Sequence, residues 1–445
     1  MHTTPLQRWL AGITLLAVVL FSAFLWLKPL LSIGGGYAAK QACSCHFLQG
    51  RALEEISEHD LNFSVLGWYG LEANDNRITS SFFGLAPRTA VYVPGLGCTL
   101  LNGDAASAPP SRSIPSHTEV RNRLQTIGYT VPSYWNEDSL RIALDYALQP
   151  VPGGVARGIA IFHRNRLITE AYGEGFFRTT PLPGWSMTKT LTGLALGAYL
   201  AQDSSLDAVN FVNKKDNLFP ELWRDKRAEI TLADLLRMNS GLEWNEGYGS
   251  ITDATVMLHE KTDFAEFAAR HQLAEEPGTV WNYSSGTTNI LMEYLREQLG
   301  SNEALYRFLD SLFTPIAPSL IIEPDQSGRP VGSSYGWATA QDWANLGQFM
   351  LQDGVWNGDT LLPPGWIDFM REPATGSDGV YGAQTWLPGP DVPSLPADAY
   401  MMRGFQDQRV FIIPSKQLVI ARLGHGDDKV TDFEGLISRI LAALE

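Results

Sequence analysis

Residues 186–201 read SMTKTLTGLALGAYLA, and the rest of the fold is best understood from this stretch. Lys189 is its only charged residue, and apolar side chains point in almost every helical direction. A helix without a polar face has to be buried on all sides. Gly193 and Gly197 leave small gaps at which neighbouring elements can approach. We therefore expect a central, fully buried helix.

Strand patterns lie on both sides of this helix. Before it, apolar runs at 157–162 and 167–172 are joined by a short polar turn, which is typical of a hairpin. After a long helical interval, residues 409–413 and 418–423 form a second hairpin pattern. Two hairpins distant in sequence most simply join one sheet. The sequence predicts a mixed α/β fold, in which an antiparallel sheet flanked by helices carries an inserted all-α lobe.

The composition of the 445 residues excludes some classes of protein. Hydrophobic residues make up 44% and charged residues 18%, which is typical of a folded chain rather than a disordered one. Lys and Arg number 33 against 48 Asp and Glu, a net charge of −15, and no basic run is present. We therefore do not expect nucleic acid as a partner. Nothing in the sequence indicates an oligomeric state.

An uncharged stretch from Trp9 to Leu27 lies near the N-terminus. A helix of this length reaches roughly across a ~30 Å hydrocarbon core, and Trp9 and Trp26 stand where indole rings favour the interface. Lys28-Pro29 follows, where a cleavage site would require small residues. We expect an uncleaved single-pass anchor in the inner membrane, with a cleaved signal peptide or a buried helix as alternatives.

The three cysteines all follow this anchor. A Cys43–Cys98 disulfide would suit an oxidising compartment and leave Cys45 over, whereas three reduced, packed cysteines are the alternative. The charges that flank the anchor are nearly balanced and orient it only weakly. On this basis the main domain is expected on the periplasmic or extracellular side.

Three regions are expected along the chain. Residues 1–34 form the anchor and a flexible exit, because three consecutive glycines begin at Gly34. Residues 35–138 form an N-terminal extension of unknown role. Residues 139–445 form the main domain.

Ser186 and Lys189 open the buried helix. Positions i and i+3 share a helix face, so the hydroxyl and the amine can touch. The helix N-terminus favours a developing alkoxide, and burial disfavours the charged form of the lysine. The alternative is a capped helix with a solvated lysine, which is difficult to reconcile with so apolar a helix.

A second candidate site lies at Tyr283 and Ser285, in a tight loop before a helix. A phenol close to an ammonium ionises more easily and can relay a proton from a serine. Ser285 could present its hydroxyl to the same cleft. Taken alone, the segment is equally compatible with an ordinary turn.

Together these motifs resemble the penicillin-recognising serine hydrolases, the superfamily of β-lactamases, D-Ala-D-Ala carboxypeptidases and esterases. In that superfamily a Tyr-x-Ser or Tyr-x-Asn motif follows Ser-x-x-Lys after about a hundred residues, and here Tyr283 follows Ser186 after 97. The matching stretches, from about residue 140 onward, are LPGWSMTK at 182–189, ITLADLLRMNSG at 230–241, PGTVWNYSSG at 277–286, DWANLG at 342–347 and DGVWNG at 353–358. The combination looks most like the branch of 6-aminohexanoate-dimer hydrolase and related amidases and esterases.

The third element of this family is a strand with Lys-Thr-Gly or His-x-Gly, and here the chain departs from the pattern. The corresponding residues 401–408 read MMRGFQDQ, with neither Lys nor His. Gly404 suits close approach to a substrate and Phe405 follows it, whereas Arg403 or Gln408 could supply a polar contact. A plain core strand with a glycine bulge is the alternative. The departure argues against β-lactam and D-Ala-D-Ala substrates.

The loop at 241–248 occupies the place at which related amidases cover their cleft. Its acidic and aromatic residues, with Tyr248 among them, could hold a substrate, or the loop could be an ordinary surface segment.

The resemblance implies a membrane-anchored serine hydrolase. Ser186 would attack a small-molecule ester or amide and form an acyl-enzyme, while Lys189 and Tyr283 share its proton. No cofactor or metal is expected. A sensor that acylates without turning over and a non-catalytic envelope scaffold are the alternatives.

Overall fold

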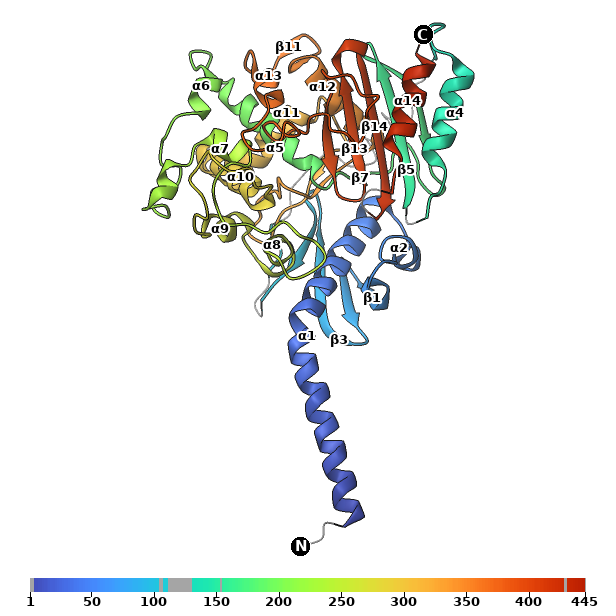
Figure 1. The fold of residues 1–445 in the computed structure, drawn as a ribbon, viewed down its shortest axis with the longest axis vertical. Coiled ribbons are helices and arrows are strands. Elements are labelled where there is room, and N and C mark those ends of the chain that lie inside the picture. Colours follow the sequence, from blue (N-terminus) through green and yellow to red (C-terminus); the bar gives the residue numbers. More distant parts are fainter. Residues whose placement is uncertain (1–3, 104–106, 111–129, 153, 428–429, 445) are drawn as a thin grey trace.

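The computed structural model describes residues 4–103, 107–110, 130–152, 154–427 and 430–444. Its centre is a five-stranded antiparallel sheet in the order β12-β13-β14-β5-β6 (Figure 1). The strands are β5 (Gly154–His163), β6 (Arg166–Tyr172), β12 (Tyr400–Gly404), β13 (Gln408–Ile413) and β14 (Leu418–Gly426). Both predicted hairpins are therefore confirmed, and pairing of β14 with β5 joins them into one sheet.

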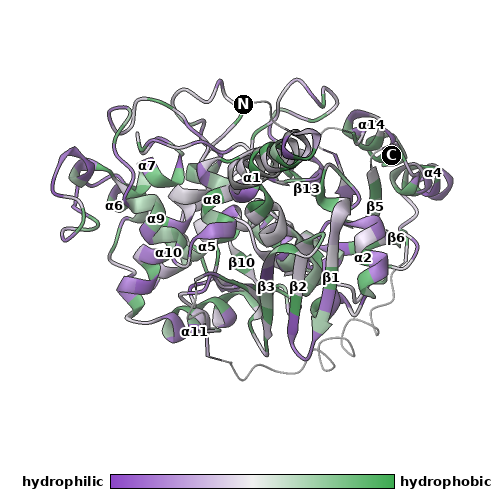
Figure 2. Cartoon of the chain, turned by 90° about the horizontal axis from the view of Figure 1, so that it is seen from below, coloured by the Kyte–Doolittle hydropathy of each residue, from purple (hydrophilic) through white to green (hydrophobic). Residues whose placement is uncertain are grey.

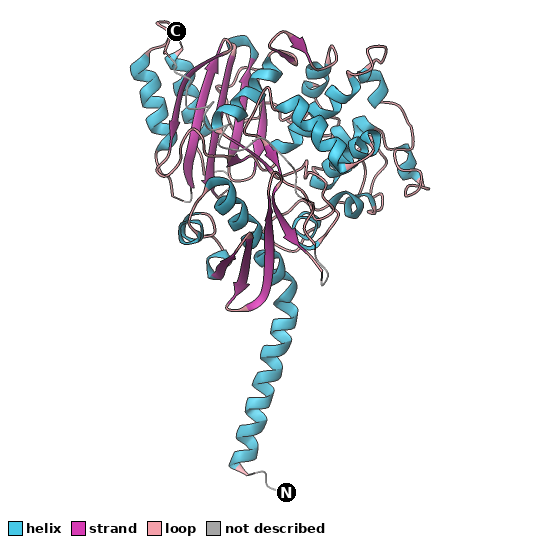
Figure 3. Cartoon of the chain, turned by 180° about the vertical axis from the view of Figure 1, so that it is seen from behind, coloured by secondary structure: helices cyan, strands magenta, loops and turns pink. Residues whose placement is uncertain are grey.

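Helices cover both faces of this sheet. On one face lie α4 (Glu137–Leu148) and α14 (Phe433–Ala443), which pack on each other and enclose a core with the sheet. On the other face α12 (Ala340–Leu351) contacts β5, β13 and β14. Figure 3 shows the strands between these helical layers, with the helical lobe beside them. The mixed α/β architecture with an antiparallel sheet is confirmed.

The helical lobe is inserted between β6 and β12. Its helices are α5 (Met187–Leu200), α6 (Ala208–Val212), α7 (Leu232–Leu236), α8 (Asp253–Glu260), α9 (Phe264–Ala269), α10 (Ser285–Leu299), α11 (Asn302–Phe313) and α13 (Trp366–Arg371). Short pairings complete it: β7 (Leu182–Pro183), β8 (Ile321–Ile322) and β9 (Gly336–Ala338) in one sheet, and β10 (Val355–Trp356) with β11 (Asp359–Thr360) in another.

The central helix α5 is buried along nearly its whole length, as its apolar sequence predicts. A side chain at Gly197 would collide with the Trp366 indole, so this glycine is where α13 packs closest to α5. The core around α5 extends without interruption from the lobe to the sheet. Helix α5 is therefore packed between the two halves of the domain.

The N-terminal extension forms a smaller α/β layer below the sheet. It consists of α1 (Pro5–Gln49), α2 (Leu53–His59) and a four-stranded antiparallel sheet of β1 (Tyr69–Asn74), β2 (Arg77–Phe82), β3 (Leu85–Val93) and β4 (Gly97–Leu101). In Figure 2, seen from below, α1 lies with β1–β3 on one side and α8 on the other.

The expected flexible exit at the three glycines is not observed, because α1 continues without a break through Gly34, Gly35 and Gly36. Their missing side chains allow close packing. A Cβ at Gly34 would lie 2.8 Å from the Tyr69 hydroxyl oxygen, and one at Gly36 would lie 3.0 Å from the Cβ of His259. The glycines are contact points for β1 and α8, and this packing outweighs their low helix propensity.

The first part of α1 projects away from the body of the protein (Figure 1). Large apolar side chains are exposed on it: Leu6, Trp9, Leu10, Ile13, Leu15, Val18 and Trp26. Within the described part of the chain, no helix is both long enough and apolar enough to cross a bilayer. The expected transmembrane helix is therefore not supported by the structure.

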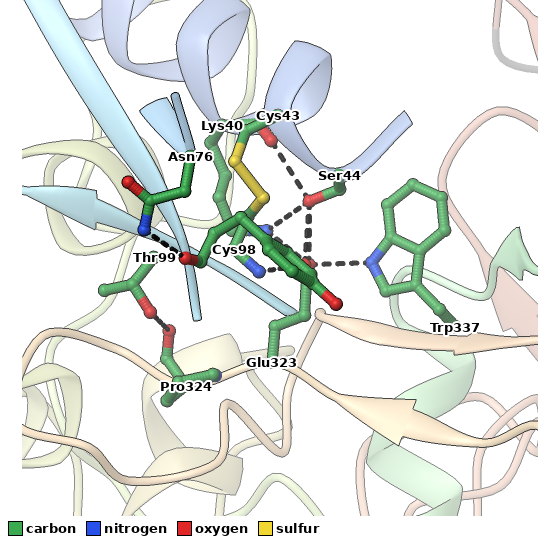
Figure 4. Close-up of a disulfide and its surroundings, with 10 residues drawn as sticks. Lys40, Cys43, Ser44, Asn76, Cys98, Thr99, Glu323, Pro324 and Trp337 are labelled. Atoms are coloured by element: carbon green, nitrogen blue, oxygen red, sulfur yellow. Dashed lines mark hydrogen bonds and ion pairs between the residues drawn. A yellow bond between two sulfur atoms is a disulfide. The ribbon is translucent and has the colours of Figure 1, made fainter. Parts of the chain in front are cut away.

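A disulfide joins Cys43 of α1 to Cys98 of β4, with Cα atoms 6.0 Å apart, and Cys45 is a buried free thiol. Beside the disulfide lies the buried carboxylate of Glu323 (Figure 4). It accepts hydrogen bonds from the Lys40 ammonium at 2.5 Å and the Cys98 backbone N–H at 2.6 Å. Glu323 therefore ties the extension to the main domain where the disulfide closes.

Removing the disulfide is expected to destabilise the protein by about 4 kcal/mol, because the bond closes a loop spanning 55 positions of the unfolded chain. Urea unfolding of the wild type and of a Cys43→Ala/Cys98→Ala variant measures the loss. Dithiothreitol should lower the stability of the wild type to that of the variant and leave the variant unchanged. Equal stability of oxidised and reduced wild type would contradict this role.

Candidate active site

Ser186 and Lys189 lie where α5 begins, at the junction of sheet and lobe. The Lys189 ammonium donates to Ser186 Oγ at 3.0 Å, to Ser285 Oγ at 2.9 Å and to the Ser333 carbonyl oxygen at 3.0 Å. Lys189 is only 1% exposed. The one-turn spacing thus places the amine within hydrogen-bonding distance of the serine hydroxyl, as the sequence predicts. The apolar helix keeps the amine away from bulk water.

Tyr283 and Ser285 reach the same point from the loop before α10. The Tyr283 side chain lines the same cleft as Ser186, and the Lys189 nitrogen lies 4.9 Å from the centre of the Tyr283 ring. Ser284 caps α10 through its hydroxyl, which fixes the loop. The structure therefore brings Ser186, Lys189, Tyr283 and Ser285 into one cluster.

Glu246 is a further member of this cluster. One carboxylate oxygen accepts hydrogen bonds from Ser285 Oγ and from the Tyr248 hydroxyl, the latter at 2.5 Å. The other accepts from the Ser285 N–H at 2.8 Å and from the Trp244 indole at 2.6 Å. The carboxylate also lies 3.9 Å from the Lys189 ammonium. The sequence offered only the acidic character of the 241–248 loop as a signal for this residue.

The two titratable groups beside Ser186 have shifted pKa values. Burial lowers the pKa of Lys189 to about 8, although the Glu246 carboxylate acts in the opposite direction. Burial raises the pKa of Tyr283, and Glu246 raises it further. A neutral amine is thus accessible near pH 8 while the phenol keeps its proton. Lys189 is suited to act as a base and Tyr283 as a proton donor.

Gly404 ends β12 directly beside the turn that carries the nucleophile. A Cβ at this position would collide with the Gly184 carbonyl oxygen, so only glycine allows the strand end to come this close. The next residue, Phe405, packs edge-on against Trp185 with ring centres 5.7 Å apart, and against Tyr248 at 5.4 Å. Gly404 and Phe405 therefore form one wall of the site.

The structure distinguishes the two polar candidates of the third element. Gln408 is fully buried, and its amide bonds backbone groups of the neighbouring turn and of Gly424. The Arg403 guanidinium lies 4.5 Å from the Trp386 ring and lines the cleft. Of the two candidates, Arg403 therefore supplies a cation to the cleft, which Arg409 also lines, and Gln408 has a structural role.

The cluster opens into a cleft of about 270 Å³, lined by Ser186, Tyr283, Tyr248, Arg403 and Phe405 among others. Among the described residues, no group of three or more His, Cys, Asp or Glu side chains could hold a metal ion. The chemistry available in the cleft is that of a nucleophilic serine, an amine base and a phenol.

Replacing Glu246 by glutamine is expected to move the acidic limb of the pH–rate profile to lower pH, because the carboxylate raises the pKa of Lys189. In the wild type, this limb should lie near pH 8. We also expect kcat/KM to fall by about tenfold to a hundredfold, because Ser285 loses a charged partner. Glu243→Gln, in an exposed position of the same loop, is the matched control. An unshifted limb in the Glu246 variant would exclude the coupling.

These features define a serine hydrolase, with Ser186 and Lys189 together at the start of one buried helix. Residues 148–445 match the family model described as Beta-lactamase, so the chain belongs to the beta-lactamase family. The resemblance inferred from the motifs is thereby confirmed.

Several known proteins are similar to this chain in sequence or in fold. The 6-aminohexanoate-dimer hydrolase of Paenarthrobacter ureafaciens is 24% identical over 313 residues, which cover 63% of this chain and 76% of that protein. EstA from Arthrobacter nitroguajacolicus Rue61a has a similar fold, with a TM-score of 0.55, 18% identity, and coverage of 71% of this chain and 98% of EstA. A penicillin-binding protein homologue from Caulobacter crescentus aligns with a TM-score of 0.53 and 15% identity, over 71% of this chain and 99% of that one.

Proposed function

We propose that this protein hydrolyses an ester or amide bond of a small molecule through an acyl-enzyme on Ser186. The observation that carries the proposal is the position of the Lys189 amine, 3.0 Å from Ser186 Oγ, together with its lowered pKa. An amine that is neutral near pH 8 can take the hydroxyl proton, and a base within hydrogen-bonding reach is what an activated serine requires. The name of one relative, the 6-aminohexanoate-dimer hydrolase, agrees with a hydrolytic function.

In the proposed reaction, Ser186 Oγ bonds to the carbonyl carbon while its proton passes to Lys189. We assign the oxyanion to the Ser186 backbone N–H and to a backbone N–H near Gly404. The tetrahedral intermediate then expels the alcohol or amine, which takes its proton from Tyr283, and Tyr283 regains one from Lys189. Water then attacks the acyl-enzyme, and protons move between the same residues in the opposite direction. This second step releases the acid.

Turnover of a p-nitrophenyl ester by the purified chain and by a Ser186→Ala variant tests the proposal. We expect steady release of nitrophenol by the wild type and at least a 10³-fold lower rate for the variant. A penicillin probe in parallel separates the alternatives. A single burst of labelling without turnover would favour a sensor, and neither labelling nor turnover would leave only a scaffold role.

We also propose that the first part of α1 attaches the enzyme to the inner membrane, with the catalytic domain on the periplasmic or extracellular side. Support comes from the absence of charge between Trp9 and Leu27 and from the exposure of Trp9 and Trp26, at 72% and 80%. Exposed apolar side chains of this size are costly in water. The Cys43–Cys98 disulfide suits an oxidising compartment.

Cell fractionation and protease digestion of intact cells or spheroplasts test this attachment. The wild type should sediment with membranes and be cut from outside the cytoplasm. A Leu15→Asp/Val18→Asp variant should move to the soluble fraction, whereas Val151→Asp, a change of an exposed valine in the main domain, should not. Wild-type protein in the soluble fraction would refute the proposal.

A further inference from the structure

A second cavity, larger than the catalytic cleft, also reaches Ser186. It measures about 460 Å³, and Ser186, Trp185, Tyr248 and Phe405 line its inner end. The catalytic serine thus stands between two spaces. One is the small polar cleft with Tyr283 and Arg403, and the other is this second cavity.

The N-terminal extension supplies much of the wall of the larger cavity. Ile33 and Tyr37 of α1 face it, and so do Phe63, Val65 and Leu66 from the segment after α2. Tyr37 stacks on Trp185 with ring centres 6.0 Å apart and meets Phe63 edge-on at the same distance. The extension is therefore part of the substrate-facing surface of the enzyme.

The chemistry of this wall suits a hydrocarbon chain. Burial lowers the pKa of His259 to about 3, so this side chain is neutral at physiological pH. Of the described residues that line the cavity, only Asp427 carries a charge at neutral pH, and it is exposed. Uncharged polar side chains share the lining, Ser64, Thr255 and Gln406 among them, but a charged group would find few counter-charges here, whereas each apolar CH₂ group would leave water.

Leu30 of α1 also lines the cavity, and the N-terminal part of the same helix projects from the body of the protein (Figure 1). Leu27 and Leu30 are both partly exposed, and the exposed apolar part of α1 begins with them. The apolar path therefore runs from the nucleophile to the base of the projecting helix. A chain bound along it would have its reactive carbonyl at Ser186 and its tail directed toward that helix.

We infer that this cavity binds the acyl chain of the substrate, so that the enzyme hydrolyses long-chain acyl esters or amides and releases a fatty acid. The inference rests on the proposed acyl-enzyme function. In the reaction the bond from the acyl carbon to the leaving oxygen or nitrogen breaks, and the bond to Ser186 Oγ forms. The leaving group takes the proton that Ser186 gives up in this step. Water then attacks the acyl carbon, its hydroxyl group replaces Ser186, and its other proton returns to Ser186 Oγ.

The dependence of the rate on acyl chain length tests the inference with the full-length protein. From p-nitrophenyl acetate to the laurate, kcat/KM should rise by about threefold to fourfold per methylene until the cavity is full, a total of at least a hundredfold. Ethyl laurate should be a better substrate than its isomer dodecyl acetate, because only the former places the long chain on the acyl side. Equal or falling rates from acetate to laurate would overturn the inference.

A substitution that fills the cavity provides a second test. Val65→Trp should lower kcat/KM for the laurate by at least tenfold more than it lowers kcat/KM for the acetate. Val65 is 39% exposed, so the tryptophan can be accommodated without unfolding. Val151→Trp, at a valine of 37% exposure away from the cavity, should change neither.

Binding of laurate to Ser186→Ala, measured by calorimetry, separates this inference from the proposed function. Stoichiometric binding that Val65→Trp weakens would support the acyl cavity even if no ester were hydrolysed, and in that case the hydrolase proposal would fail alone. Hydrolysis of the acetate without laurate binding or chain-length preference would overturn the acyl cavity and leave the hydrolase proposal intact.

Discussion

Replacing Lys189 by methionine is expected to lower kcat/KM for any substrate by about 10³-fold or more. The amine contacts both Ser186 Oγ and Ser285 Oγ, and burial holds its pKa near 8. Methionine is similar in length but cannot accept the serine proton, and loss of a general base typically costs 10²- to 10⁴-fold. The acidic limb of the pH–rate profile should disappear with it.

The Lys189→Met protein should still fold, because the helix around this position is apolar. Unfolding curves and circular dichroism check this. Lys215→Met, at a lysine with 67% of its side chain exposed, is the matched control and should keep full activity. A Lys189 variant with more than a tenth of wild-type activity and an unchanged pH profile would exclude Lys189 as the base.

Replacing Asp60 by asparagine is expected to destabilise the fold by about 3–5 kcal/mol. The carboxylate is fully buried between the Arg157 guanidinium at 2.6 Å and that of Arg51 at 2.7 Å. Arg157 lies on β5 and Arg51 follows α1, so Asp60 joins the extension to the central sheet. Asparagine would remove the ion-pair partner of the buried Arg157 and leave Arg51 with only its half-exposed partner Glu55, and breaking a buried ion pair from one side is costly.

Urea unfolding of Asp60→Asn measures this loss. The control is Asp138→Asn, whose ion pair with Arg141 is exposed and should contribute less than about 1 kcal/mol. Burial raises the pKa of Asp60, but Arg157 and Arg51 outweigh this and lower it to about 2. Its stabilisation is thus complete above the ordinary carboxyl pKa and is lost as the pH falls toward 2. Equal stability of the two variants would contradict the account.

The parts of the fold that the sequence predicts are those with a local signal. The hairpins at β5–β6 and β13–β14 follow from short apolar runs around tight turns, and the burial of α5 follows from its lack of a polar face. The contact between Ser186 and Lys189 follows from helix geometry alone. Tyr283 lies 97 residues after Ser186, and no local pattern links the two residues. Only the family resemblance predicts that Tyr283 belongs to the same site.

The parts that the sequence does not predict depend on distant partners. Glu246 lies in a loop without periodicity, and its partner Ser285 is 39 positions away. Asp60 meets Arg157 across 97 positions. The low helix propensity of the three glycines in α1 predicts a break in the helix. The packing of Tyr69 and His259 against these glycines favours the helix instead. Tertiary contacts decide each of these features.

The central claim is that Ser186 carries the acyl group. It is tested most directly by allowing the full-length protein to react with a fluorophosphonate and mapping the modified peptide by mass spectrometry. The account predicts one adduct per chain on Ser186, no adduct in Ser186→Ala, and much slower labelling in Lys189→Met. An adduct on any other residue, or equal labelling of the Ser186→Ala protein, would contradict it.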